Sequence, residues 1–299
     1  MDTKPDLIGL GRVGCVMRIG DIAVKTANKW PVPANASEYT TILHHQTNRM
    51  NEDALIHEGY IYRHLESVEG VLKPLDISET EIRMPYICHR SLDRYIRARK
   101  TIIKDEQYLA WLQNAADIIH RVHGQRVIVA DIATRNFLVN NDLSLQLCDF
   151  SESLIIPEDR ALDEFISEEF LSIKFDIARF GSMVYEIVSG RRYEFYINPE
   201  IDMDLEDGES KTYKEWPTIE QLPDTSNIFL GDIIRKCWLK DGFHSMKDVQ
   251  AALHSTHCSM NKTEVSLDWR IITTVILVTM IVARCLPWRK VADTLPFKR

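Results

Sequence analysis

The chain has 299 residues, of which 45% are hydrophobic and 27% are charged, and this composition is close to that of an average soluble globular protein. It argues against a mainly disordered, a collagen-like or a many-spanning membrane protein. The 36 Lys and Arg residues are outnumbered by 44 Asp and Glu residues, which gives a net charge of −8. We therefore expect no nucleic acid among the partners, because contacts to phosphates need a basic surface.

The cysteines and the N-terminus indicate the compartment. Six cysteines are spread along the chain, with no C-x-x-C pair and no cluster with histidine at zinc spacing. This pattern favours reduced thiols over a disulfide framework. Residues 1–8 contain no apolar core of the length of a signal peptide. The sequence thus predicts a cytoplasmic protein.

The first thirty residues predict three short strands joined by tight turns. Glycines follow the apolar pair Leu7-Ile8, and a Gly20-Asp21 turn separates two β-branched runs, which is a hairpin signal. The elements expected here and directly after are strands at 15–19 and 22–26, a loop at 31–37, a helix at 51–67, and strands at 71–77 and 81–87.

From residue 91 onward the predicted structure is mainly helical. The segment Phe175–Val188 is apolar on nearly all sides, as expected of a buried helix. Residues 198–224 are polar and acidic and are predicted to form a surface excursion. Other helices are expected at 91–99, 107–123, 228–238 and 245–254, and short buried strands at 127–130, 137–139 and 145–148. A small strand-rich part followed by a larger helical part is an α+β arrangement.

The C-terminal region differs from the rest of the chain. Residues 256–299 contain seven Lys and Arg and three Asp and Glu, a net +4, so residues 1–255 carry −12. The stretch at 269–288 would be roughly 30 Å long as a helix, about one bilayer core, and it has aromatic and basic residues at its ends. Its uninterrupted apolar run, 271–283, is only thirteen residues, a length that core helices also have. We expect either a transmembrane or membrane-associated helix that anchors the protein, or a helix docked on the larger helical part of the chain.

Residues 9–16 read G-x-G-x-x-G-x-V, with Gly9, Gly11, Gly14 and Val16 at the fixed positions. An ordinary tight hairpin explains such glycines equally well. Alternatively, glycines let backbone N–H groups close over phosphates. A dinucleotide-binding site would need a helix directly after the glycines, and here a strand follows, which argues against that kind of site.

Lys25 ends the run Ile22-Ala23-Val24-Lys25, eleven residues after Gly14. A lysine on a strand is more often solvated, but strand alternation can also point it inward beneath the glycines. Glu58 on the following helix would then be its partner, and the ion pair would hold the ammonium group at the phosphates. Glu52 is the second candidate partner, although its place in the first turn of the expected helix favours a capping role.

The most specific pattern is an acid followed five residues later by an asparagine and, thirteen residues after that, by a second acid: Asp131, Asn136 and Asp149. Asp131 follows an apolar strand, so it lies at a strand end, where a base can meet a substrate hydroxyl. Asn136 and Asp149 supply the oxygen ligands that suit Mg²⁺. Both acids could instead cap turns, but their order after the glycines and Lys25 favours the chemical interpretation.

In this order the motifs resemble those of the protein kinase family, over about residues 5–255. The resemblance implies that Asp131 is the catalytic aspartate, and that Asn136 and Asp149 bind the metal. It makes Lys25 the phosphate-binding lysine and Met84 the gatekeeper before the hinge. The residues that it places around ATP are Gly9, Gly11, Gly14, Val16, Ala23, Lys25, Glu58, Met84, Tyr86 and Ile87.

The resemblance also implies a bilobal α+β fold, with a β-rich N-lobe at 5–85, a hinge at 86–90, a helical C-lobe at 91–255 and the basic tail 256–299. The implied activity is transfer of the γ-phosphoryl group of Mg-ATP to a Ser, Thr or Tyr hydroxyl of a protein. ATP, Mg²⁺ and a protein substrate are therefore expected. The alternative is a pseudokinase, a nucleotide-binding or scaffold module without phosphotransfer.

Several positions depart from the family pattern and support this alternative. Val129-Ala130 stand where His-Arg would precede the catalytic aspartate. A phosphorylated activation loop then has no arginine to dock on. Without the histidine, a hydrogen bond that braces the metal-binding loop is expected to be lost. Ser151 replaces the glycine of D-F-G, and its Cβ restricts positive φ. No A-P-E motif is evident, and Glu168 or Glu169 is the nearest match to its glutamate.

Overall fold

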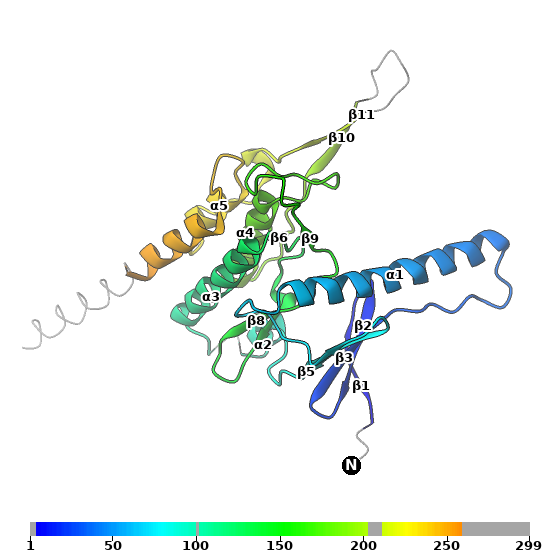
Figure 1. The fold of residues 1–299 in the computed structure, drawn as a ribbon. Coiled ribbons are helices and arrows are strands. Elements are labelled where there is room, and N and C mark those ends of the chain that lie inside the picture. Colours follow the sequence, from blue (N-terminus) through cyan, green and yellow to red (C-terminus); the bar gives the residue numbers. More distant parts are fainter. Residues whose placement is uncertain (1–3, 100–101, 203–210, 259–299) are drawn as a thin grey trace, which may run out of the picture. The chain divides into compact units, whose positions relative to one another are not determined.

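The computed structural model describes residues 4–99, 102–202 and 211–258, and for 198–214 it describes the backbone alone. Residues Met1–Leu253 form one compact unit, which contains the labelled elements of Figure 1. Residues 246–258 are helical, and the last of them belong to the second unit, His254–Arg299. The apolar helix expected at 269–288 lies outside the described residues. Within the described ranges, no helix is both long and apolar enough to cross a membrane.

The small lobe is built on one antiparallel sheet. Its strands are β1 (Asp6–Leu10), β2 (Gly14–Ile19), β3 (Ile22–Ala27), β4 (Asp76–Ile77) and β5 (Glu81–Pro85), in the spatial order β1-β2-β3-β5-β4. The strands expected around 15–19, 22–26 and 81–87 are thereby confirmed. Of the strand expected at 71–77, only Asp76–Ile77 join the sheet, and Val71 forms an isolated bridge to Leu147. Pro74, which lies between them, has no N–H to donate to a ladder.

Helix α1 (Glu38–His64) packs on this sheet against β3 and β5. It begins at the cap formed by Ser37, whose hydroxyl accepts a hydrogen bond from the Thr40 N–H, well before the predicted start at residue 51. The buried residues of α1 begin only at Asn51, and the apolar residues of the earlier turns, Tyr39, Ile42 and Leu43, are exposed. The prediction began at the buried face and missed these turns. Figure 1 shows this first half of α1 extending beyond the sheet. Glu52 therefore lies inside the helix, and its predicted place in the first turn was wrong.

The large lobe is mainly helical, as predicted. Its helices are α2 (Leu92–Arg99), α3 (Asp105–Gly124), α4 (Ile173–Ser189) and α5 (Gly231–Trp238), with short 3-10 helices η1 (Thr134–Asn136) and η2 (Ile219–Gln221). Its short strands pair as β6 (Val127–Ile128) with β9 (Leu154–Ile155), and as β7 (Phe137–Val139) with β8 (Leu145–Leu147). A strand-rich small lobe is thus followed in the chain by a mainly helical large lobe, which is an α+β fold.

The region predicted as a surface excursion contains a two-stranded ribbon instead. Strands β10 (Asn198–Asp202) and β11 (Lys211–Glu215) pair antiparallel. Their sequences, NPEID and KTYKE, are mostly polar, and they lack the alternation of apolar residues by which a strand is predicted. The backbone pairing therefore could not be read from the hydropathy pattern.

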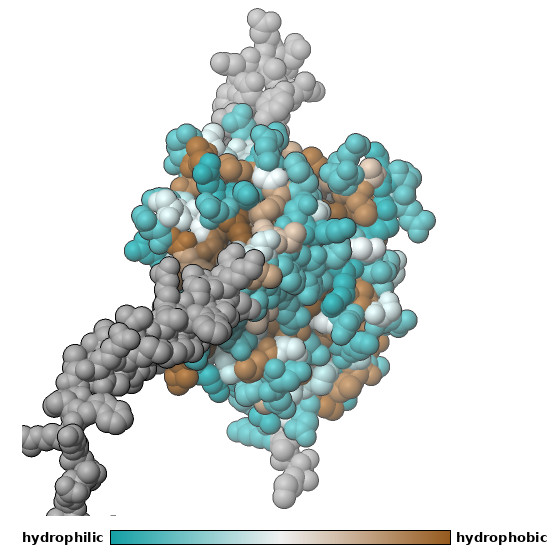
Figure 2. All heavy atoms as spheres, turned by 90° about the vertical axis from the view of Figure 1, so that its left-hand side faces the viewer, coloured by the Kyte–Doolittle hydropathy of each residue, from teal (hydrophilic) through white to brown (hydrophobic). Residues whose placement is uncertain are grey.

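Helix α4 is the buried centre of the large lobe. Ala178, Phe180 and Val184 on it are completely buried, and it packs against α3 and α5. At Gly181 a Cβ atom would lie 2.6 Å from the Cβ of Cys237 on α5, so this glycine allows the two helices their close approach. The face of the molecule drawn in Figure 2 is mostly hydrophilic, with separate hydrophobic patches. The burial of most α4 residues places its apolar side chains in the interior.

The loop between β6 and η1 is anchored to α4 by one buried carboxylate. Asp176 accepts hydrogen bonds from the Val129 N–H at 2.7 Å and from the Ala130 N–H at 2.8 Å, and its Oδ2 lies 2.8 Å from His123 Nε2. Ala130 has a φ of 64°, a conformation that costs a residue with a Cβ about 1–3 kcal/mol. The Asp176 carboxylate therefore holds a strained loop in place, directly before Asp131.

Replacing Asp176 by Asn should lower the free energy of unfolding by about 2–4 kcal/mol, because an amide turns a donor toward groups that need an acceptor in a fully buried place. Urea unfolding of the full-length chain measures this. Asp232→Asn is the matched control, since Asp232 lies exposed in the first turn of α5, and it should cost about 0.5 kcal/mol or less. Equal losses for both variants would contradict the anchoring role of Asp176.

Candidate functional site

A cavity of about 390 Å³ lies where the small-lobe sheet meets the large lobe. All ten residues predicted to surround ATP line it, and so do Asn136 and Asp149. Asp131 does not line this cavity; it lines a neighbouring hollow of about 740 Å³ together with Glu152, Phe175 and Tyr196. The structure thus gathers the predicted residues at two adjoining hollows.

Lys25 lies on β3, the middle strand of the sheet, where it is paired with Val16 on β2 and Ile82 on β5. Its Nζ is 2.6 Å from Glu58 Oε2 on α1 and 2.8 Å from Asp149 Oδ1 after β8. Lys25 is 7% exposed and Glu58 is completely buried. Lys25 thus points inward from the strand, and its partner is Glu58, the first of the two candidate glutamates.

The second candidate partner, Glu52, binds a different lysine. Its Oε1 is 2.7 Å from Nζ of Lys29, and both side chains are exposed to solvent. A pair of this kind contributes little to stability. Glu52 therefore belongs to the surface of α1 and takes no part in the cavity.

Lys25 attracts both carboxylates, whereas Glu58 and Asp149 repel each other. Burial alone would lower the pKa of Lys25, but the carboxylates of Glu58 and Asp149 outweigh it and raise that pKa. Burial would raise the pKa of Asp149, yet Lys25 and hydrogen bonds from Ser151 hold it below its usual value. The pKa of Glu58 is raised by burial, which Lys25 offsets only in part. At neutral pH the site therefore presents an ammonium group beside an ionised Asp149.

The segment after β8 is held by Tyr62 from α1. The Tyr62 hydroxyl accepts a hydrogen bond from the Asp149 N–H at 3.2 Å, and the Phe150 ring packs edge-on against the Tyr62 ring, 5.1 Å between centroids. Asp149 has a φ of 66°, whereas Ser151 does not take a positive φ. The Cβ of Ser151 therefore meets no backbone conflict here, and its hydroxyl donates to Asp149 Oδ1 at 2.9 Å.

Asp131 lies at the end of the anchored loop and accepts several hydrogen bonds. Asn136 Nδ2 donates to its Oδ2 at 2.9 Å and to its backbone carbonyl at 2.8 Å. Arg135 donates to both carboxylate oxygens, at 2.5 and 2.7 Å, and Arg179 from α4 donates to Oδ1 at 3.2 Å. Asp131 is thus fixed by its own loop and by the central helix.

The loop before Asp131 is braced although Val129-Ala130 stand in place of His-Arg. The Val129 N–H bonds to Asp176, and the Val129 carbonyl accepts a hydrogen bond from the Ser153 hydroxyl at 3.0 Å. Backbone groups therefore hold the loop before Asp131 without help from the side chains at positions 129 and 130.

The glycine turn is held by Asn28, which follows β3. Its side-chain amide donates to the carbonyl of Gly11 at 2.8 Å and to that of Arg12 at 3.1 Å. Gly14 has a steric role, since a Cβ there would lie 2.7 Å from the Thr26 carbonyl oxygen. At Gly9 and Gly11, a Cβ would make only ordinary contacts at 3.5 Å. The fold itself therefore requires glycine at position 14 but not at 9 or 11.

Sequence reasoning missed several residues of the site. Leu72 and Leu138 line the cavity, and both were identified only as members of predicted strands. Asn28, Tyr62 and Arg179 act through contacts between residues far apart in the chain. Cys148 was not missed: its place directly before Asp149 allowed it to line the pocket or to be a small buried hydrophobe. It lines the cavity, and its thiol donates to the Asn136 carbonyl at 3.3 Å. A hydropathy pattern predicts which face of a helix or strand is buried, but it does not predict which residues of other elements that face contacts.

Comparison with known proteins finds one family and several distant relatives. The family model of the protein tyrosine and serine/threonine kinases matches residues 6–244. Ephrin type-A receptor 1 of Homo sapiens is 25% identical over 209 residues, which cover 63% of this chain and 20% of the receptor. Spermatocyte protein spe-8 of Caenorhabditis briggsae is 28% identical over 125 residues, 38% of this chain and 24% of that protein. Mitogen-activated protein kinase kinase kinase dlk-1 of Caenorhabditis elegans is 24% identical over 168 residues, 51% of this chain and 18% of that protein.

The aligned part is between 18% and 24% of the length of these three relatives, so their whole-protein properties do not carry over. The family match itself runs from β1 in the small lobe to beyond α5 in the large lobe. It includes every residue assigned above to the two hollows. The chain therefore belongs to the family of protein tyrosine and serine/threonine kinases.

Proposed function

We propose that this chain is an ATP-dependent protein kinase, which transfers the γ-phosphoryl group of Mg-ATP to a Ser, Thr or Tyr hydroxyl of a protein. The observation that carries the proposal is the position of Lys25 Nζ, 2.6 Å from Glu58 and 2.8 Å from Asp149. A buried ammonium group beside an ionised carboxylate, at one end of a cavity roofed by glycines, suits a phosphate chain and its metal.

The adenine base would lie between apolar side chains of the two lobes. Val16 and Ala23 on one side and Leu138 on the other line the cavity. The Ile87 N–H has no hydrogen-bond partner among the described residues, so it is free to donate to the edge of the base. This supports the hinge assignment of Met84, Tyr86 and Ile87.

The phosphates would lie under the glycine turn. Gly9 and Gly11 line the cavity, and packing within the protein does not require glycine at either position. A molecule that approaches the backbone closely does require it, because a Cβ would occupy the same space. Lys25 would hold the phosphates as a charged donor.

Mg²⁺ would be held jointly by the protein and the nucleotide. Asn136 and Asp149 offer oxygen ligands at the cavity wall, which suit this ion. In the part of the chain that the structure describes, no group of three or more His, Cys, Asp or Glu side chains could bind a metal alone. We therefore assign the remaining ligands to phosphate oxygens and water. The bound ion would neutralise charge on the phosphates.

Asp131 would orient the hydroxyl of the protein substrate and accept its proton. Its carboxylate lines the 740 Å³ hollow beside the nucleotide cavity, which gives a segment of another protein room to approach. Arg135, whose side chain is 45% exposed, is free to leave the carboxylate when that hydroxyl arrives. Asn136 and Arg179 would keep Asp131 in place meanwhile.

A pseudokinase is the second candidate function. It is favoured by Val129-Ala130 before Asp131 and by Ser151 after Phe150, since each replaces a residue of the catalytic pattern. In that case the cavity would bind nucleotide without phosphotransfer. The two functions differ in one measurable respect, the transfer of phosphate.

The full-length protein incubated with Mg-ATP and generic protein substrates should incorporate phosphate, and Asp131→Asn and Asp149→Asn should each reduce kcat by at least about 100-fold. Asp142→Asn is the control, because Asp142 lies exposed in the turn between β7 and β8 and bonds only to Ser144. Background incorporation in all four proteins would contradict the kinase proposal. A Mg²⁺-dependent rise in Tm with ATP in those same samples would then favour the pseudokinase.

Gly11→Ala should weaken ATP binding about tenfold, while the free energy of unfolding without nucleotide stays within about 1 kcal/mol of the wild type. The added methyl group has room in the protein alone but would meet the phosphates. Isothermal titration calorimetry with Mg-ATP and urea unfolding measure the two effects. Gly124→Ala, at the end of α3 with no atom within 4 Å of the added Cβ, is the control and should leave ATP binding unchanged. Unaltered ATP affinity in Gly11→Ala would contradict the position proposed for the phosphates.

A further inference from the structure

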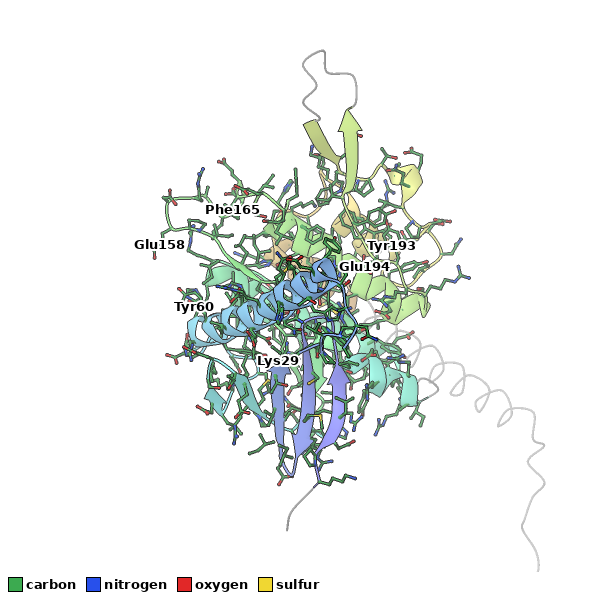
Figure 3. The ribbon with its side chains drawn as sticks, turned by 90° about the vertical axis from the view of Figure 1, so that its right-hand side faces the viewer. Lys29, Tyr60, Glu158, Phe165, Tyr193 and Glu194 are labelled. Carbon is green, nitrogen blue, oxygen red and sulfur yellow. The ribbon has the colours of Figure 1, made fainter. Side chains whose placement is uncertain are left out.

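Arg179 is a buried cation beside the proposed catalytic aspartate. It lies on α4 and is 8% exposed. Its Nη2 is 3.2 Å from Asp131 Oδ1, and its Nη1 is 2.8 Å from Glu194 Oε1. Glu194, labelled next to Tyr193 in Figure 3, lies in the stretch that follows α4. The guanidinium group therefore bridges two carboxylates from different parts of the large lobe.

Burial and two carboxylate partners keep Arg179 in place. A buried guanidinium needs paired acceptors, and its planar fork fixes the geometry of both carboxylates that it binds. Arg179 also lies three residues after Asp176, on the same side of α4. Asp176 binds the backbone before Asp131, and Arg179 binds the side chain of Asp131 itself. One helix thus holds the catalytic loop at both its backbone and its carboxylate.

Arg135 also binds Asp131 but is placed differently. Its side chain is 45% exposed, against 10% for that of Arg179. Arg135 comes from the same loop, four residues after Asp131, so it moves with the loop and cannot fix it to the rest of the lobe. Of the two arginines that bind Asp131, Arg179 is therefore the one with a fixed position.

The segment at 150–172 offers no evident place for a regulatory phosphate (Glu158 and Phe165 mark it in Figure 3). It contains four serines and no threonine or tyrosine. The hydroxyls of all four serines are engaged in hydrogen bonds. Their partners are Asp149 for Ser151, the Val129 carbonyl for Ser153, Glu169 for Ser167 and the Phe175 N–H for Ser172. Two of them, Ser153 and Ser172, are buried.

The charge of the same segment also disfavours a phosphate. It contains seven acidic residues and one arginine, so a phosphoserine there would be repelled by its neighbours. The arginine that would bind such a phosphate next to Asp131 is replaced by Ala130. Nothing in the segment therefore requires a phosphate to bring Asp131 into position.

We propose that Arg179 is a positioning residue, which holds the Asp131 carboxylate from α4 and keeps the site assembled without a phosphate on residues 150–172. The inference rests on the proposed kinase function, because it concerns how that site is held ready. It assigns to the central helix a task that otherwise falls to a modified activation segment.

The test compares kcat and the KM for ATP in full-length Arg179→Met, Arg179→Lys and the wild type. We expect Arg179→Met to lower kcat at least tenfold with the KM for ATP changed by less than about twofold, because Lys25 and the glycine turn are untouched. Arg179→Lys keeps the charge without the fork and should fall between the two. Arg121→Met is the control. Arg121 lies on α3 and approaches Glu69 at 3.9 Å, from a side chain that is 42% exposed, and its replacement should leave kcat within twofold.

A second arm treats the wild type with a phosphatase until mass spectrometry finds no phosphate on the chain. The kcat should stay within twofold of the untreated protein, and a larger loss would overturn the proposal. If the wild type transfers phosphate but both Arg179 variants keep at least half of its kcat, the positioning role is wrong and the kinase function stands. If the wild type transfers no phosphate, the kinase function itself fails, and this inference fails with it. If Arg179→Met does not fold, as judged by the loss of a cooperative thermal transition, the result for Arg179→Lys decides.

Discussion

Lys25 and Glu58 are buried and meet the partly exposed Asp149 at the cavity wall, and each of the three comes from a different part of the chain: the middle strand of the sheet, the helix packed on it and the segment after β8. A charge removed from water is tolerated only beside its opposite, and loss of one partner from such a group typically costs about 3–5 kcal/mol. The three elements are therefore bound to a single relative arrangement. Because Asp149 belongs to the large lobe and the other two to the small lobe, this contact also sets how the cavity walls face each other.

A second set of buried charges organises the other side of the site. Asp176 and Arg179 lie one turn apart on α4, a helix most of whose residues are buried. Asp176 stabilises a backbone conformation that Ala130 would otherwise avoid, with a φ of 64°. A rigid central helix is a suitable source of such contacts, because its own position is fixed by packing and a displacement of about 1 Å at a catalytic group is costly. The loop that carries Asp131 is thus determined by α4 more than by its own sequence.

The sequence alone predicted those parts of the site that depend on local pattern. The alternation of β3 carries Lys25 inward, and the apolar face of α1 brings Glu58 with it, so their pairing could be expected from two short segments. The pair β10–β11 could not be predicted, because its residues show no apolar periodicity. The first turns of α1 were missed although Tyr39, Ile42 and Leu43 have helical spacing, because the predicted helix was limited to the part with a buried face. Asn28, Tyr62 and Arg179 were missed for a different reason: each acts on a partner brought close only by the tertiary fold. Arg179 is the clearest case, since an arginine within a nearly all-apolar helix signals a buried counter-charge without saying which carboxylate supplies it.

This structure accommodates the residues that depart from the family pattern. The residues that would touch a nucleotide are present and line one cavity, whereas Val129 and Ala130 replace residues of the loop before Asp131, and Ser151 replaces the glycine after Phe150. Val129 and Ala130 still bind α4 through their backbone N–H groups, which do not depend on the side chain, and Ser151 accommodates its Cβ because the positive φ falls on Asp149. Arg179 is buried and bridges Asp131 and the more exposed Glu194. On the proposed function, the large lobe holds Asp131 through this side chain from α4, where the family pattern has an arginine directly before the aspartate.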